Sequence, residues 1–192
     1  FQDCKNLSRL QLPNGITEIE PQTFRGCTSL TTVTIPDATK KIGSYAFAYS
    51  GLTEITIPAN VTAIQNQAFQ GCKALQKIVI NNSRTTIGDS TFADCTALSD
   101  VDLGSKTVSL GTSAFKGCDA LASIVLPDTI KTIGNNVFEH CDALADVKLS
   151  AGLTAIPANA FNQCASLSTI KIPYEVTKIG SNAFSNCVKL SE

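Results

Sequence analysis

Large apolar residues recur along this chain with a fixed period. The nine phenylalanines lie 23 residues apart except for one interval of 22, and a cysteine follows each of them by three residues except where Ser50 takes its place. The unit reads C-x-x-L-x-x-I-x-I-P-x-x-V-x-x-I-G-x-x-A-F-x-x. A period of this length is typical of solenoids built from stacked supersecondary units. The pattern therefore predicts an array of about eight repeats.

Each repeat contains a strand, a bend and a short closing segment. The L-x-x-I-x-I stretch ends in alternating apolar residues rich in Ile and Val, which indicates a half-buried strand that a proline such as Pro127 ends. The next two apolar positions are expected to carry the chain around a bend. A glycine such as Gly43 or Gly134 then marks a tight turn, where we expect a positive φ. The stretch that follows, for example residues 180–187, is expected to form one helical turn.

Stacked coils of this kind bury one continuous column of Leu, Ile, Phe and Cys side chains. Strands of neighbouring coils then pair in parallel about 4.8 Å apart. Because the helical side is bulkier, we predict an α/β repeat solenoid shaped as an arc, with a parallel β-sheet on the concave face and short helical turns on the convex face. We assign residues 1–192 to a single array that lacks caps, and we expect it to be a fragment of a longer chain.

The 23-residue unit resembles the BspA-like (Treponema-type) class of leucine-rich repeats over the whole chain. Individual repeats depart from it, since Thr39, Arg84 and Thr107 occupy a normally apolar position, and we expect those coils to be looser. The resemblance implies a cell-surface or secreted, non-catalytic protein linked to adhesion. Its implied partners are host or matrix proteins or neighbouring cell-surface proteins. The family has no shared catalytic motif, and the resemblance implies no cofactor.

Charge and composition narrow the possible functions. The formal net charge is −1, which argues against a nucleic-acid partner, and no apolar run approaches the ~18 residues of a membrane-spanning helix. Asp100 and Asp102 point to one face of a strand about 6.6 Å apart, a spacing compatible with acid–base chemistry, but an open face would not exclude water. His140 has no second histidine as a partner. We therefore predict no enzyme activity, no metal site and no cofactor.

The eight cysteines recur at the repeat period and include no C-x-x-C pair. They fit either a disulfide or metal framework, or a ladder of buried free thiols. Stacked side chains would keep their Cβ atoms about 4.8 Å apart, whereas disulfides need about 3.5–4.5 Å. Zinc sites use closely spaced pairs of ligands. We therefore predict free, buried thiols.

Two columns of strand residues point away from the predicted core and form the candidate ligand face. The first column is Arg9, Thr32, Glu54, Lys77, Asp100, Ser123, Asp146 and Thr169, and the second is Gln11, Thr34, Thr56, Val79, Asp102, Val125, Lys148 and Lys171. These positions vary between repeats, as a binding surface or any unconstrained surface would.

No aromatic residue stands in either column. The three tyrosines, Tyr45, Tyr49 and Tyr174, lie outside the strands. Tyr45 and Tyr49 fall in the short repeat, where they either pack or form a small exposed patch. We predict a protein-binding or adhesion module; the alternative is a structural spacer or stalk that presents other domains.

Overall fold

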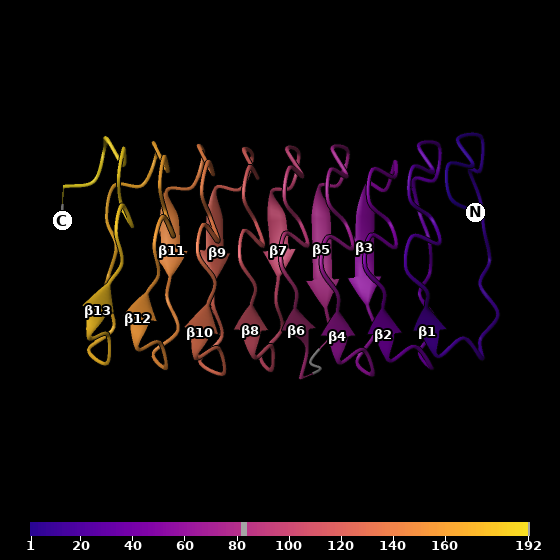
Figure 1. The fold of residues 1–192 in the computed structure, drawn as a ribbon, viewed down its shortest axis with the longest axis horizontal. Helices are drawn as coiled ribbons and strands as arrows, with labels where there is room; N and C mark the ends of the chain where they lie inside the picture. Colours follow the sequence, from indigo (N-terminus) through magenta and orange to yellow (C-terminus); the bar gives the residue numbers. More distant parts are fainter. Residues whose placement is uncertain (82–83, 192) are drawn as a thin grey trace.

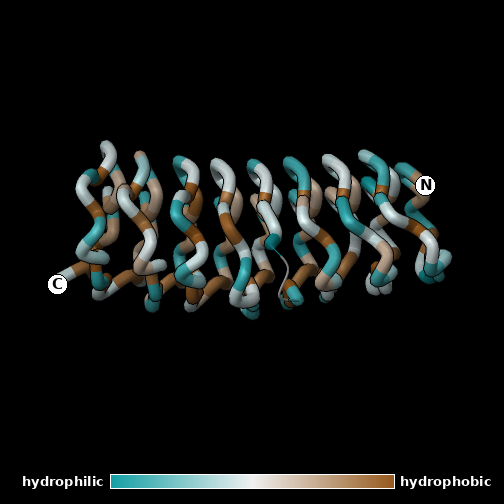
Figure 2. The backbone as a smooth tube through the Cα atoms, turned by 90° about the horizontal axis from the view of Figure 1, so that it is seen from below, coloured by the Kyte–Doolittle hydropathy of each residue, from teal (hydrophilic) through white to brown (hydrophobic). Residues whose placement is uncertain are grey.

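The computed structural model describes residues 1–81 and 84–191, so Asn82, Ser83 and Glu192 of the predicted array lie outside the described residues. The chain forms a parallel β-solenoid in which each repeat makes one coil (Figure 1). In two perpendicular views the coils lie side by side in a nearly straight row, so the curvature is shallow (Figures 1 and 2).

The predicted strands lie on one limb of the coil. They are β3 (Glu54–Ile57), β5 (Lys77–Ile80) and β7 (Asp100–Asp102), which form one parallel sheet, and β9 (Ser123–Val125) and β11 (Asp146–Lys148), which form another. Side chains alternate between exposed and buried, as the apolar pattern predicts. The strands pair in register, so that the outward positions of neighbouring coils form straight columns.

A second parallel ladder lies where the sequence predicts only a bend. One sheet contains β1 (Glu18–Ile19), β2 (Lys41–Ile42), β4 (Ala63–Ile64), β6 (Thr86–Ile87), β8 (Ser109–Leu110) and β10 (Thr132–Ile133), and β12 (Ala155–Ile156) pairs with β13 (Lys178–Ile179). Each of these strands has one buried Ile or Leu, except β13 at the end of the array, whose Ile179 is exposed. In Figure 1 these arrows point up, opposite to the strands of the first limb.

The expected helical turns are wrong, because residues 1–81 and 84–191 contain no helix. The backbone is left-handed two residues before and after Phe24, at Gln22 (φ 61°) and Gly26 (φ 71°), and the same holds around each later phenylalanine. The Phe24 N–H donates to the Ala46 carbonyl in the next coil at 2.7 Å. An α-helix needs consecutive right-handed residues bonded within one segment. Here the amide groups join neighbouring coils instead, and the segments form a ladder of turns.

The recurring glycine after the second ladder does not take the positive φ that we expected. It is required by close approach of the coils. A Cβ on Gly111 would lie 2.5 Å from the backbone carbonyl carbon of Gly88, and one on Gly43 would lie 2.6 Å from the Pro21 nitrogen. The hydrogen atom of glycine therefore lets adjacent backbones pack in contact.

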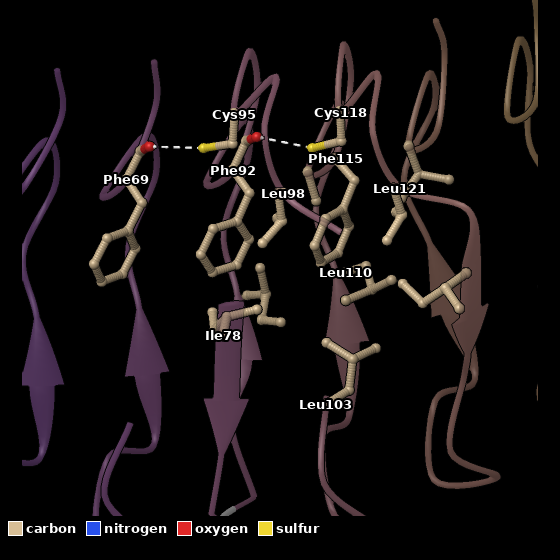
Figure 3. Close-up of a cluster of buried hydrophobic side chains, with 14 of the residues drawn as sticks. Phe69, Ile78, Phe92, Cys95, Leu98, Leu103, Leu110, Phe115, Cys118 and Leu121 are labelled. Atoms are coloured by element: carbon tan, nitrogen blue, oxygen red, sulfur yellow. Dashed lines mark hydrogen bonds between the residues drawn. The ribbon is translucent and has the colours of Figure 1, made fainter. Parts of the chain in front are cut away.

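The core is organised around a stack of all nine phenylalanine rings, of which Phe69, Phe92 and Phe115 are labelled in Figure 3. Successive ring centroids are 5.1–5.7 Å apart and the ring planes differ by only 3–20°. Rings from Phe24 to Phe161 are fully buried, whereas Phe1 is 60% exposed. Each ring packs against the rings of the neighbouring coils, so the stack ties the coils together along the whole array.

The cysteines are free, as predicted; Cys4 is exposed and the other seven are buried. Each buried thiol also donates a hydrogen bond to the phenylalanine carbonyl of the preceding coil, as Cys95 does to Phe69 at 3.2 Å (Figure 3). Burial raises the pKa of Cys72 to about 11 and that of Cys164 to about 12. The thiols therefore stay protonated at neutral pH and remain donors.

Polar residues inside the core are satisfied by hydrogen bonds to neighbouring backbone. Thr39 and Thr107 are fully buried, and their hydroxyls donate to the carbonyls of Ile16 and Leu103. Arg84 is exposed, and its neighbour Thr85 is the buried residue, so the predicted register was wrong there by one position. No buried side-chain nitrogen or oxygen of the described residues lacks a partner.

Candidate interaction face

The two predicted outward columns form one surface, which we call the strand face. All of its residues are exposed except Val79, which is half-buried. The columns run across β3, β5 and β7 and across β9 and β11, because these strands pair in register. The outward residues of the remaining coils lie on residues 9–12, 32–35 and 169–172, which form no strand.

The ladder under the strand face is interrupted in four places. Within the described residues, no strand pairing joins residues 9–12 to 32–35, residues 32–35 to β3, β7 to β9, or β11 to residues 169–172. The second ladder pairs β1 to β10 continuously and β12 with β13, so all four of these coil pairs are held together on that side although the strand side is unpaired. A hollow lies at every interruption.

The largest of these four hollows, which we call the N-terminal groove, has a volume of about 760 Å³. Its strand-face residues are Arg9, Thr32, Thr34, Glu54, Thr56, Lys77 and Val79. Leu10 and Val33 are only half-buried here, so the groove reaches the apolar core. Smaller hollows of about 530 Å³ and 400 Å³ lie between β7 and β9 and beside β11.

Three charged residues of the strand face, Lys77, Asp100 and Asp102, have partners of their own. Lys77 Nζ lies 2.7 Å from Asp100 Oδ2, and the hydrogen bond and charge of Asp100 raise the pKa of Lys77. Asp102 accepts a 2.8 Å hydrogen bond from the Gly104 N–H. Asp100 and Asp102 share a face as expected, but each carboxylate has its own partner, which does not suit a pair working as acid and base.

His140 and Glu139 lie on the turn segments and have partners there. The His140 ring hydrogen-bonds to Gln163 at 3.1 Å. Burial by itself would raise the pKa of Glu139, but hydrogen bonds from Lys116, Asn136 and Asn162 lower it to about 2. This buried carboxylate joins three successive coils and stabilises the stack.

Two kinds of feature are absent from residues 1–81 and 84–191. No three His, Cys, Asp or Glu side chains come together where they could hold a metal ion. No helix there is long and apolar enough to cross a membrane.

Sequence reasoning placed the strand face but missed part of the N-terminal groove. Asp37, Pro58 and Asn81 also line it. They lie at the ends of the strand segments, so the repeat proline at Pro36 and Pro58, and its replacement by Asn81, were the available signal. The half-buried floor had no signal, because Leu10 and Val33 look like the core residues of every other repeat.

The comparison with protein families settles which repeat this is. The sequence profile of the BspA type leucine rich repeat region matches residues 1–120 and 85–192, in six copies. The chain belongs to the BspA-type leucine-rich repeat family. The stacked coils and parallel ladders of this BspA-type array agree with that assignment. No curated protein sequence matches the array.

Several solved structures resemble the BspA-type array. A leucine-rich cell surface protein from Faecalibacterium prausnitzii is 34% identical over all of this chain and 54% of its own, with a TM-score of 0.62. A leucine-rich repeat protein from Eubacterium ventriosum is 31% identical over 91% of this chain and 47% of its own, with a TM-score of 0.78. The leucine-rich repeat protein of T. pallidum is 27% identical over 92% of this chain and 72% of its own, with a TM-score of 0.64. The array thus spans about half the length of the first two.

Proposed function

We propose that this BspA-type array is a non-catalytic adhesion module of a cell-surface or secreted protein, and that it binds its partner through the strand face. The N-terminal groove is the observation that carries the proposal. It combines an apolar floor at Leu10 and Val33 with a polar, charged rim, and protein interfaces have this arrangement of an apolar centre and a polar rim. Its rim carries both signs of charge, from Arg9, Glu54 and Lys77.

The partner that fits is a host or matrix protein, or a protein on a neighbouring cell. The similarity to a cell surface protein of Faecalibacterium prausnitzii supports the surface or secreted location. A mixed-charge rim gives binding that weakens with salt, because exposed charge pairs are screened.

The test is binding of the purified chain to a panel of extracellular-matrix proteins and to intact host cells, at low and at ~0.5 M salt. The variant Thr34→Arg/Thr56→Arg places two long side chains in the N-terminal groove without changing a buried residue. The control Thr17→Arg/Thr154→Arg makes the same change at two exposed threonines elsewhere. We expect at least a tenfold loss of affinity in the groove variant alone. Equal losses in both variants, or none in either, would contradict the proposal.

A structural spacer is the second candidate. The strand face has no aromatic anchor of the kind that dominates many binding hot spots, and the continuous phenylalanine stack favours a stiff rod. If the chain is a spacer, we expect no saturable binding by the folded, monomeric chain. We also expect that the strand-face residues can be exchanged without loss of any activity.

A further inference from the structure

The short repeat carries a second hollow, on the turn segments rather than on the strands. It has a volume of about 380 Å³ and is lined by Gln22, Arg25, Tyr45, Tyr49, Gln67 and Gln70, which come from three successive coils. None of these residues belongs to the strand face. The hollow brings together two of the three tyrosines of the chain, an arginine and three side-chain amides.

Both tyrosines occupy left-handed backbone positions, with φ of 57° at Tyr45 and 58° at Tyr49. The fold needs a left-handed residue at these two places in every coil, but it does not need an aromatic one. The same positions hold Asn136 and Gly26 in other coils. Gly and Asn tolerate this conformation, whereas a bulky side chain there is an outlier. The left-handed conformation therefore belongs to the repeat, and the two tyrosine side chains are what set this coil apart.

The ring of Tyr49 is held between residues of the two neighbouring coils. It lies against the backbone of Gly71, where an added Cβ would come within 2.5 Å of the ring atoms Cδ1 and Cε1. The guanidinium carbon of Arg25 lies 5.7 Å from the ring centroid, as in a cation–π contact. Glycine in the next coil and arginine in the preceding one therefore fix the ring, while 43% of the residue stays exposed.

The polar groups of the hollow are free to bind a ligand. Among the described residues, the side chains of Gln22, Tyr45 and Arg25 make no hydrogen bond or ion pair. Gln67 donates to Gln70 at 3.0 Å, which leaves an amide oxygen on Gln67 and an amide nitrogen on Gln70. The lining includes no carboxylate, no lysine and no aliphatic side chain.

We propose that this hollow binds a saccharide. A sugar ring offers apolar C–H groups to the exposed parts of the tyrosine rings and a set of hydroxyls that both donate and accept hydrogen bonds, which match the amides and phenols. Protein hot spots also use Tyr and Arg, but they need a desolvated, apolar centre, and this hollow has three amides and no aliphatic side chain in its lining. The volume lies at the lower end of the roughly 300–1,000 Å³ of small-molecule sites. The unpaired guanidinium of Arg25 adds a donor for a hydroxyl or an acidic substituent.

The test is binding of the whole chain to an array of neutral and acidic oligosaccharides, followed by titration calorimetry with the best binder. The variant Tyr45→Asn/Tyr49→Gly installs residues that the fold already uses at these positions. We expect at least a tenfold loss of affinity together with an unchanged or higher midpoint of thermal unfolding, because the variant relieves the left-handed strain. Tyr174→Asn is the control, since this tyrosine is 98% exposed and lies outside the hollow.

Two results would overturn the proposal. One is the absence of saturable binding to every oligosaccharide on the array. The other is binding that the double variant retains, or that Tyr174→Asn weakens equally. The outcome is independent of strand-face binding, since the Thr34→Arg/Thr56→Arg variant leaves all six lining residues intact.

Discussion

The buried cysteines join adjacent coils by donating a hydrogen bond as well as by filling space. The sequence predicted their burial and their free state, because the period rules out ligand pairs. It did not predict the acceptor, which is the phenylalanine carbonyl of the preceding coil. Ser50 shows that another small donor fits the ladder, since its hydroxyl lies 3.4 Å from Cys72 Sγ.

Alkaline pH should destabilise the array through these thiols. Burial raises the pKa of Cys72 from an ordinary 9.0 to about 11, so its contribution to stability is complete below pH 9 and is lost as the pH rises through 11. We expect the free energy of unfolding to fall by about 2 kcal/mol by pH 11 for this thiol. Urea unfolding at pH 7, 9 and 10.5 measures the fall. Cys72→Ser should show a smaller fall, and an identical slope in both proteins would refute the assignment.

The unfolding free energy lost on removing a phenylalanine ring should depend strongly on the position of that ring in the stack. Phe92→Ala removes a fully buried ring between two stacked neighbours and should cost about 3–5 kcal/mol of unfolding free energy. Phe1→Ala should cost much less, because Phe1 is 60% exposed and stacks on one side only. Chemical denaturation of both variants makes the comparison. Similar losses would mean that the stack does not set the stability.

At the scale of the element, apolar alternation predicted the strand limb, but the other two sides of the coil were misread. The second ladder uses two residues per strand, such as Lys41–Ile42, and two residues are too few to display an alternation. The turn segments were taken for helix because their Ala-Phe-x-x-Cys spacing suits one. Their left-handed positions hold Gln, Ser, Asn and Tyr as well as Gly, so composition does not reveal them.

For the candidate sites too, the sequence predicted what is local to one repeat and missed what depends on neighbouring coils. Alternation placed both columns of the strand face, because which face a strand residue takes is a local property. The N-terminal groove depends on whether neighbouring coils pair, for example residues 32–35 with β3, and nothing in the repeat pattern distinguishes coils that pair from coils that separate. The hollow lined by Tyr45 and Tyr49 likewise needs Arg25 and Gln70 from neighbouring coils, although the two tyrosines stood out in the short repeat.

Glycine substitutions test how closely the elements of adjacent coils approach. Gly111→Ala would bring a methyl group to 2.5 Å from the backbone of Gly88, and we expect a loss of about 1–3 kcal/mol as the coils shift apart. Gly15→Ala is the matched control, since no atom lies within 4 Å of its added Cβ, and its effect should stay within about 0.5 kcal/mol. Thermal unfolding of the two variants measures the difference. Equal midpoints would mean that close backbone contact at Gly111 does not limit how the coils pack.

At the scale of the whole molecule, each coil packs only on its neighbours, and the ladders and the phenylalanine stack repeat that arrangement along the row. Stability of such arrays is close to a sum of coil and interface contributions. The thiol ladder provides a built-in probe of this behaviour, because it places one reporter in nearly every coil.

Thiol labelling should therefore follow position in the stack. Cys4 is exposed and should react at once, while Cys118, in the middle, should react last, since reaching it requires coils to separate. Mass spectrometry after timed alkylation gives the order, and labelling in denaturant should find all eight thiols. Simultaneous reaction of the buried thiols would indicate a single cooperative unit in place of a nearest-neighbour array.

Because each coil packs only on the coils directly before and after it, the array also has a characteristic response to force. A force that pulls the two ends apart along the row meets the coil interfaces in series, so an end coil peels away while the rest stays intact. Each peeled coil releases 23 residues, or about 80 Å of extended chain. A tether of this kind lengthens in steps under load and shortens again when the load is removed. At a surface swept by flow, it would limit the peak tension on whatever contact the chain makes.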